Sequence, residues 1–262
     1  MTDLWDKFTI RAKELAAAHA EASELLLFYA RLLEAQGRIY EELANAQGWL
    51  PSGVLSQDIE TVRSQLPILL TTVKEVGPPK LAVEADHLMS APQSVLDEVL
   101  VNYWFTPSDV QFFGKAVFQP YLRRLFEIGT KPIDRGIESS GNRCPFCGGR
   151  PQLAYMTAQD PASDGGSKQL LCSACLTSWP FRRVVCAQCN EERPARLCYF
   201  HNAEWDYIRA DACDTCHSYL KSIDLSRLGI AIPLIDEVAA PALDVWAVQH
   251  GYKKIELNLI GL

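Results

Sequence analysis

Cysteine is absent from the first 143 residues of this 262-residue chain, and all nine cysteines lie between Cys144 and Cys216. The start of the sequence also lacks the apolar stretch of a signal peptide, because residues 1–8 include two aspartates and a lysine. The most apolar early run, residues 25–30, ends at Arg31 and is far shorter than the roughly 20 residues that span a bilayer. These absences predict a cytoplasmic chain with no membrane span, in which the cysteines stay reduced rather than forming a disulfide framework.

The sequence has no surplus of basic side chains. Its formal net charge is −7, and residues 141–222, which hold all the cysteines, contain nine Lys/Arg against eight Asp/Glu. Because a divalent ion bound by four thiolates carries a net −2, two such sites would bring this segment to about −3. A nucleic-acid-binding surface needs a basic stripe, so we expect no nucleic-acid partner. The motifs GxxxxGK(S/T), GxGxxG and HExxH are missing too, which leaves nucleotide-driven and zinc-protease chemistry without support.

An all-α domain is predicted for residues 1–140, because apolar residues recur there at helical spacing. The clearest helix covers residues 21–47, and the segment from Gly48 to Gly53, which contains Pro51, interrupts it. Further helices are predicted near residues 57–76, 80–102, 107–117 and 118–129.

The sequence after residue 130 changes in character. Residues 131–142 are rich in Pro, Gly and Ser and mark a domain boundary. Short β-rich segments then alternate with the cysteines, as in small metal-binding ribbons. Strands are expected near residues 152–156, 169–172, 181–185, 195–200 and 207–210, and a helix near 235–250 is followed by a strand or docked tail. The fold class is therefore α+β, with a helical domain (1–140), two tandem four-cysteine modules (141–180 and 181–222) and a C-terminal helix and tail (223–262).

Eight of the nine cysteines form four Cys-x-x-Cys pairs, and the pairs belong to an internal repeat. The first two pairs are separated by 24 residues and the last two by 23, and Arg-Pro follows the first pair of each copy. The pairs are Cys144/Cys147, Cys172/Cys175, Cys186/Cys189 and Cys213/Cys216. A Cys-x-x-Cys turn points two thiolates at one ion, and two such turns complete a tetrahedron, as in zinc ribbons. The repeat predicts two ions, each held by one copy. A cross-brace with interleaved pairs is the geometric rival, because only ten residues separate the two copies.

The spacing also limits the chemistry of the two sites. Four thiolates suit zinc and mononuclear iron equally, so the sequence predicts iron or zinc. A complete set of protein ligands leaves no open position for water or substrate, so catalysis at the metal is not expected. The residue after the second cysteine of a pair is often left-handed. Gly148 and Asn190 suit that conformation, whereas Leu176 and His217 suit it less well.

Cys198 is the cysteine outside the pairs. Its place in an apolar, β-rich run predicts a small buried residue rather than a reactive thiol, since no basic neighbour lowers its pKa. His201 and His217 could become ligands only by displacing a cysteine, so we expect them at the surface or beside the ligands.

The residues around the cysteines carry a more specific signal. The runs are Cys144-Pro-Phe-Cys-Gly-Gly-Arg-Pro, Leu171-Cys-Ser-Ala-Cys, Val184-Val-Cys-Ala-Gln-Cys and Ala212-Cys-Asp-Thr-Cys-His-Ser-Tyr-Leu-Lys, with a helical Phe28-Tyr-Ala-Arg-Leu-Leu-Glu-Ala-Gln in the first half. Together they resemble the family of the formate dehydrogenase accessory protein FdhE, over most of the chain. The resemblance implies a helical domain followed by two rubredoxin-like modules, with iron at all eight paired cysteines. It also implies a cytoplasmic maturation factor that binds the catalytic subunit of a molybdenum or tungsten formate dehydrogenase and is not itself an enzyme.

Two other functions fit parts of the pattern. Zinc ribbons of the same spacing occur in nucleic-acid-binding proteins, which would show saturable, salt-sensitive binding of DNA or RNA. A thiol-based redox or sulfur-carrier protein would use one pair as a dithiol, and it would show a free thiol of low pKa in the metallated protein.

Overall fold

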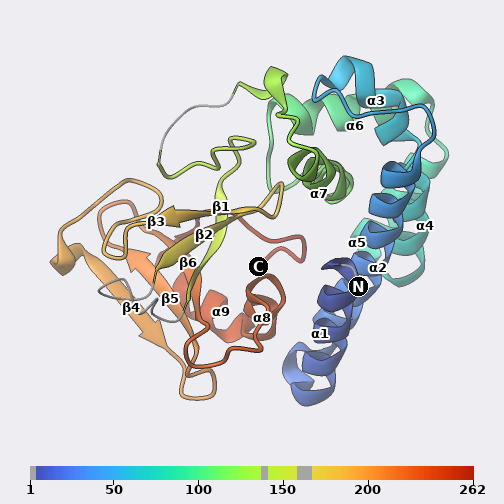
Figure 1. Cartoon of the computed structure of the whole chain (residues 1–262). Coiled ribbons are helices and arrows are strands. Elements are labelled where there is room, and N and C mark those ends of the chain that lie inside the picture. The colour runs from blue at the N-terminus through green and yellow to red at the C-terminus, as the bar shows by residue number, and fades with distance from the viewer. Residues whose placement is uncertain (1–3, 137–140, 158–166) are drawn as a thin grey trace.

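Helices make up the N-terminal half of the protein. The computed structural model describes residues 4–136, 141–157 and 167–262, and the helices of the first half form one side of the molecule (Figure 1). They are α1 (Leu4–Ala18), α2 (Ser23–Asn45), α3 (Leu55–Arg63), α4 (Leu66–Val76), α5 (Pro79–Met89), α6 (Gln93–Phe105) and α7 (Phe112–Glu127). The predicted helix at 21–47 is confirmed as α2, which buries Leu26, Tyr29, Leu33 and Ile39 against its neighbours. None of the helices in the described ranges is long and apolar enough to cross a membrane.

Proline positions explain where the helix predictions differ from the structure. The predicted helix at 57–76 is two helices, because Pro67 occupies the first turn of α4 and starts a new helix there. The predicted helix at 80–102 is likewise divided between α5 and α6, just before Gln93, by Pro92. The predicted break between 117 and 118 is wrong, since α7 continues through Pro120. Almost every residue of α7 up to Leu122 is buried, so packing outweighs the hydrogen bond that this proline removes.

The cysteine-rich half forms one mixed sheet. Its strands are β1 (Pro151–Met156), β2 (Lys168–Cys172), β3 (Ser178–Phe181), β4 (Leu197–His201), β5 (Ile208–Cys213), β6 (Ser218–Asp224) and β7 (Lys253–Lys254). The order is β3-β2-β1-β6-β5-β4, with β7 beside β6. Each copy of the repeat supplies an antiparallel three-stranded part. The two parts join where β1 runs parallel to β6, from Leu153 opposite Lys221 to Met156 opposite Asp224.

Two strand predictions differ from the structure. The predicted strand at 181–185 is wrong, because β3 ends at Phe181 and the chain then crosses to the next Cys-x-x-Cys turn. Strand β6 was not predicted. It carries Lys221, Ser222 and Asp224. This polar segment lacks the alternation of apolar and polar residues that indicates a strand with one solvent-exposed face. The side chains of Lys221 and Ser222 are nevertheless buried: Lys221 lies under the C-terminal helices, where it donates to Asp244, and Ser222 lies on the other face, where it donates to Asp211 of β5.

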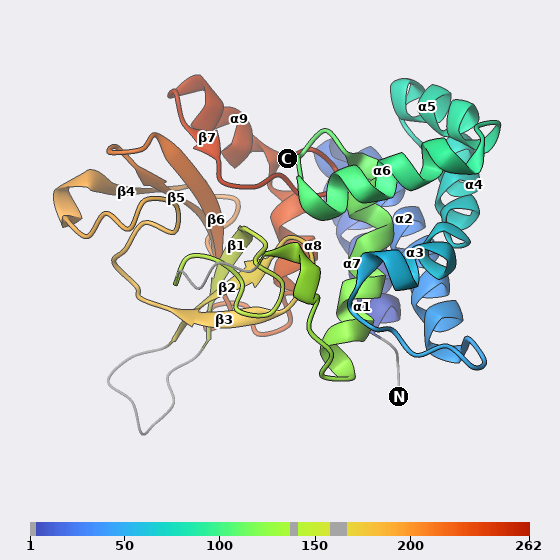
Figure 2. The ribbon, with the colours of Figure 1, turned by 90° about the horizontal axis from the view of Figure 1, so that it is seen from above.

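The C-terminal segment fills the space between the sheet and the helical half. Seen from above, α8 lies between them, while α9 covers the second part of the sheet (Figure 2). The predicted helix at 235–250 is divided into α8 (Pro233–Ala239) and α9 (Pro241–Gln249), because Pro241 starts a new helix. Asp236 of α8 accepts a hydrogen bond of 2.6 Å from Arg11 of α1. The tail that follows α9 is docked, with Ile255 and Leu259 buried.

A group of buried ions fastens this segment to the sheet. Lys221 of β6 is fully buried and donates to Asp244 of α9 and to the backbone oxygen of Glu237. Lys254 donates to the Glu237 carboxylate at 3.0 Å, and Tyr219 donates to Asp244 at 2.9 Å. Two lysines and two carboxylates thus balance one another where water is excluded, which is the condition for burying charge. One hydrophobic core runs from Trp5 through Leu153 to Leu259, and the division at residues 140, 180 and 222 stays a prediction.

Candidate metal centres

The structure brings the first four cysteines together. The Sγ atoms of Cys144, Cys147, Cys172 and Cys175 lie within 4.8 Å of one another, and all four side chains are buried. Cys144 and Cys147 come from the turn before β1, whereas Cys172 ends β2 and Cys175 follows it. Because β1 and β2 are antiparallel neighbours with Pro151 opposite Cys172, the two turns meet at one end of the hairpin.

The second cluster repeats this arrangement at the other part of the sheet. The Sγ atoms of Cys186, Cys189, Cys213 and Cys216 also lie within 4.8 Å of one another. Here Cys213 ends β5, and Cys216 lies in the turn between β5 and β6. The thiols are therefore grouped copy by copy, and the interleaved cross-brace does not occur. Burial differs between the clusters, since Cys189 is exposed and Cys216 half-buried, which leaves the second cluster open to solvent and chelators.

Backbone hydrogen bonds close the first Cys-x-x-Cys turn of both copies in the same way. Cys144 donates to Gly149 and receives a bond from Gly148, both at 2.9 Å, and Cys186 likewise donates to Glu191 at 2.9 Å and accepts from Asn190 at 3.1 Å. Gly148 and Asn190 are left-handed, with φ of 72° and 59°, as predicted.

The same conformation follows the other two pairs, although the residues there suit it less well. Leu176 and His217 are also left-handed, with φ of 56° and 52°. All four turns therefore have the same handedness, although a Cβ makes this conformation unfavourable by roughly 1 kcal/mol or more. The need to point two sulfurs at one centre outweighs the preference of the residue.

Sulfur separations test whether the clusters fit a tetrahedral ion. The closest recorded pairs are Cys144 and Cys175 at 3.5 Å, Cys147 and Cys172 at 3.5 Å, Cys186 and Cys216 at 3.6 Å, and Cys189 and Cys213 at 3.8 Å. Four sulfurs at about 2.3 Å from a central ion lie about 3.8 Å apart. A disulfide would bring two sulfurs to about 2.0 Å. The donor set and its spacing thus fit one tetrahedral metal ion in each cluster.

Electrostatics points the same way in the first cluster. Burial raises the pKa of the Cys172 and Cys175 thiols, whereas hydrogen bonds from neighbouring thiols, Cys147 first, lower the pKa of Cys144. Four buried thiols cannot all lose their protons side by side unless a cation neutralises them. A divalent ion supplies that charge, and two clusters of this kind can bind two metal ions.

Several residues around the first cluster were not predicted from the sequence. The Oγ1 atom of Thr177 lies 3.0 Å from Cys175 Sγ and 3.6 Å from Cys144 Sγ. A Cβ on Gly149 would lie only 2.8 Å from Cys172 Sγ. Gly149 is the second glycine of the motif Cys-Pro-Phe-Cys-Gly-Gly, so the sequence could have indicated that it has a role. Nothing in the sequence around Thr177 indicates that it lies beside the cluster.

A buried glutamine pair links the first cluster to the helices. Gln119 of α7 donates to the backbone oxygen of Ser173, between the two cysteines of the turn, at 2.7 Å. Gln36 of α2 in turn donates to the Gln119 side-chain oxygen at 2.9 Å. Glutamines inside a helical pattern look like surface residues in the sequence, and only the packing of α7 on this turn reveals their role.

Residues 184–260 match the family model "FdhE, C-terminal domain". The chain is similar to a protein FdhE homolog of Aquifex aeolicus, 28% identical over 258 residues that cover 92% of this chain and 89% of that protein. It is 25% identical over 250 residues to protein FdhE of Escherichia coli, covering 93% of this chain and 79% of that protein. The crystal structure of the FdhE protein from Pseudomonas aeruginosa has the same fold, with a TM-score of 0.70, 23% identity, and coverage of 99% of this chain and 96% of that one.

Together these matches support membership of the FdhE family. The helical half, the mixed sheet and the two Cys-x-x-Cys clusters form the α+β fold that the sequence predicted.

Cys198 and two histidines, for which the sequence also made predictions, lie outside the clusters. Cys198 lies on β4, is half-buried rather than fully buried, and is 3.6 Å from an Asp214 carboxylate oxygen. Burial, followed by the charge of Asp214, raises the pKa of its thiol, which favours the unreactive protonated form. His201 and His217 are both exposed and lie outside the two four-cysteine groups.

Proposed function

We propose that this FdhE family member is an assembly partner of a molybdenum or tungsten formate dehydrogenase. It binds the catalytic subunit in the cytoplasm during maturation and catalyses no reaction itself. The observation that carries the proposal is the pair of four-cysteine clusters in a chain of this family. Each cluster has its full set of ligands, so a bound ion would keep no position for substrate.

We further propose that all eight paired cysteines are metal ligands and that each cluster holds one iron or zinc ion. The ions would lock the turns and so present the surface of the sheet in one shape, because the strands that the turns connect are short. Iron bound by four thiolates would also respond to oxygen, which zinc cannot do. Metal analysis of protein purified without air, together with the visible absorption of ferric thiolate, distinguishes the two ions.

The alternative functions have less support. A nucleic-acid-binding ribbon would need a basic stripe, whereas the chain carries a net charge of −7. A thiol-based redox or sulfur-carrier protein would use one pair as a dithiol, whereas every pair lies in a four-cysteine group whose spacing fits a metal ion.

The test is deletion of the gene in the source organism, with formate oxidation measured by dye reduction. We expect the deletion strain to lose most of this activity and the wild-type gene to restore it. We also expect the catalytic subunit to co-purify with the tagged chain. Normal activity in the deletion strain, with no catalytic subunit co-purified, would refute the proposal.

A further inference from the structure

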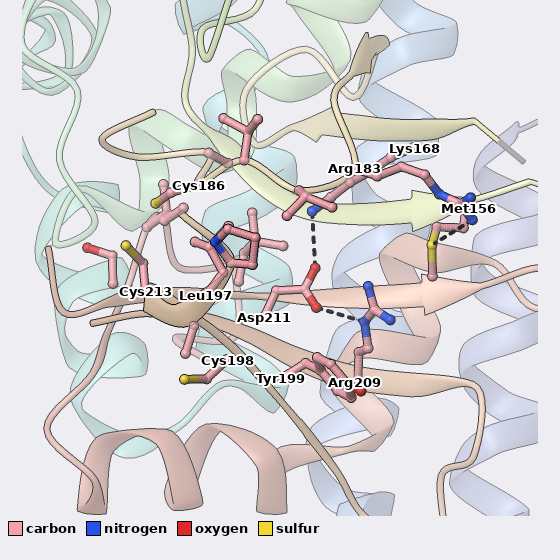
Figure 3. Close-up of a pocket in the computed structure, with 18 of the residues that line it drawn as sticks. Met156, Lys168, Arg183, Cys186, Leu197, Cys198, Tyr199, Arg209, Asp211 and Cys213 are labelled. Carbon is pink, nitrogen blue, oxygen red and sulfur yellow. Dashed lines mark hydrogen bonds and ion pairs between the residues drawn. The ribbon is translucent and has the colours of Figure 1, made fainter. Parts of the chain in front are cut away.

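A cavity of about 610 Å³ lies on the face of the sheet that α9 leaves uncovered (Figure 3). Side chains alternate along β5: Arg209 and Asp211 line the cavity, whereas Ala210 packs with Ala247 of α9 on the opposite face. Residues 183–187, which lead into the second cluster, also line the cavity. The space is thus bounded by both parts of the repeat.

The two ends of this cavity differ in charge. Cys186 and Cys213 of the second cluster lie at one end, and Lys168, Arg183 and Arg209 lie toward the other (Figure 3). Two of these cations share one carboxylate, that of Asp211: Lys168 binds it at 3.1 Å and Arg209 at 2.7 Å. Lys168 is only 4% exposed, so its charge is shielded from water and acts strongly inside the cavity.

The third cation, Arg183, has no carboxylate partner among the residues that the structure describes. Its recorded contact is with Met156 Sδ at 4.0 Å. The other acidic side chain of the lining, Asp224, is held by Ser226 at 2.6 Å and lies 3.8 Å from Arg227. This end of the cavity therefore has more positive than negative charge within a chain that is acidic overall, and an anionic group would complete it.

The shape indicates an extended ligand. A second cavity of about 540 Å³ shares Lys168, Arg183, Val184 and Val185 with the first, so the two form one elongated groove with the cations in its middle. Strand β4, which lines the first cavity, is an edge strand paired with β5. Its other edge can hydrogen-bond an extended backbone. Tyr199 and Val184, which also line the first cavity, are 63% and 55% exposed and can make apolar contacts with a bound peptide.

We propose that this groove binds an extended acidic peptide segment of a partner protein, with its carboxylates at Lys168, Arg183 and Arg209 and its backbone beside β4. The proposal rests on the proposed function for the identity of that partner, since the segment would belong to the formate dehydrogenase catalytic subunit. The groove itself requires only an extended chain with acidic side chains.

The test uses the metal-loaded full chain and a dye-labelled dodecapeptide with a central Val-Glu-Val-Glu sequence. Its twin has lysine in place of glutamate. We expect fluorescence anisotropy to show at least about tenfold tighter binding of the acidic peptide, and Arg183→Gln to weaken it at least about tenfold, the effect of one charge-assisted hydrogen bond. Arg31→Gln, which removes the same charge from an exposed position of α2, should leave the affinity unchanged. Val184→Glu should weaken binding without removing a cation.

The outcomes separate this inference from the proposed function. Equal affinity for both peptides, or full affinity in Arg183→Gln with two metal equivalents still bound, overturns the peptide site. Binding of inorganic phosphate but of neither peptide also overturns it, because the groove would then take only a small anion. Co-purification of the catalytic subunit with Arg183→Gln at the wild-type level would refute the groove and leave the proposed function standing. Selective binding of the acidic peptide without any co-purified subunit would refute the proposed function and leave the groove standing.

Discussion

Gly149 illustrates how closely single residues are adapted to the first cluster. The position where its Cβ would lie is 2.8 Å from Cys172 Sγ and 3.3 Å from Cys147 Sγ. Both neighbours are metal ligands in our proposal, and neither can move away without distorting the tetrahedron. The requirement is therefore steric, and it differs from the left-handed backbone that Gly148 supplies.

We expect Gly149→Ala to weaken metal binding at the first cluster by at least about tenfold, because the added methyl displaces a ligand sulfur. Zinc affinity is measured by competition with a chromophoric chelator. Gly141→Ala is the matched control, since nothing lies within 4 Å of the position of its Cβ. Equal affinity of the two variants would contradict the steric argument.

Lys221 is the basis of a second prediction at the residue scale, because its ammonium group is fully buried beside Asp244. Lys221→Met should lower the free energy of unfolding by roughly 3 kcal/mol, since it leaves two buried carboxylates, those of Asp244 and Glu237, to share Lys254. Urea unfolding followed by tryptophan fluorescence measures the loss. Lys74→Met removes a lysine from the exposed pair with Asp86 and should change stability little. Adding Asp244→Leu to Lys221→Met should recover part of the loss; a further drop would argue against an unpaired charge as the cause.

At the scale of elements, the two copies of the repeat keep their turns but differ in surroundings. The first cluster is enclosed by α7 through Gln119, whereas Cys189 of the second is open to solvent. Strands β1 and β6 join the copies in parallel, although each copy alone is antiparallel. The repeat is therefore a repeat of ligand geometry, not of environment.

Because the thiols are grouped copy by copy, we expect the double variant Cys144→Ala, Cys147→Ala to bind one metal ion in place of two. Metal content per chain is measured by elemental analysis after removal of loosely bound ions. The matching double variant Cys186→Ala, Cys189→Ala should also keep one. Loss of both ions from either variant would mean that the clusters depend on each other.

At the scale of the whole molecule, the helical half supplies most of the largest fully buried side chains of the shared hydrophobic core, whereas the sheet also depends on its turns. Trp5, Tyr29, Trp104 and Phe113 are all almost completely buried among the helices. The sheet has short strands, and its four turns close in two pairs, each pair around four thiols. The C-terminal segment then connects the two parts through the contact of Arg11 with Asp236.

We therefore expect a strong chelator to unfold residues 141–222 while most of the helical signal in far-ultraviolet circular dichroism remains. Added zinc should restore the lost order. Loss of nearly all helical signal would mean that the continuous core makes the two halves fold as one unit, and the predicted domain division would then be wrong.

Local chemistry is what the sequence by itself determined about this protein. Four Cys-x-x-Cys turns at near-equal spacing are a property of neighbouring residues, so the two clusters and their members could be named in advance. Helix α2 was visible for the same reason, because its apolar stripe is periodic. The motifs around the cysteines were enough to indicate the family.

The tertiary structure alone decided what depends on distant segments. Pro120 stays inside α7 because α7 is buried almost all round, and β6 is a strand because the C-terminal helices cover its Lys221 while Asp211 of β5 binds its Ser222. Leu176 and His217 are left-handed because their turns must close around a shared centre. The groove of Lys168, Arg183 and Arg209 exists because β1 and β6 bring the two copies side by side. In each case a contact between residues far apart in sequence outweighs a local preference, and no local pattern records such a contact.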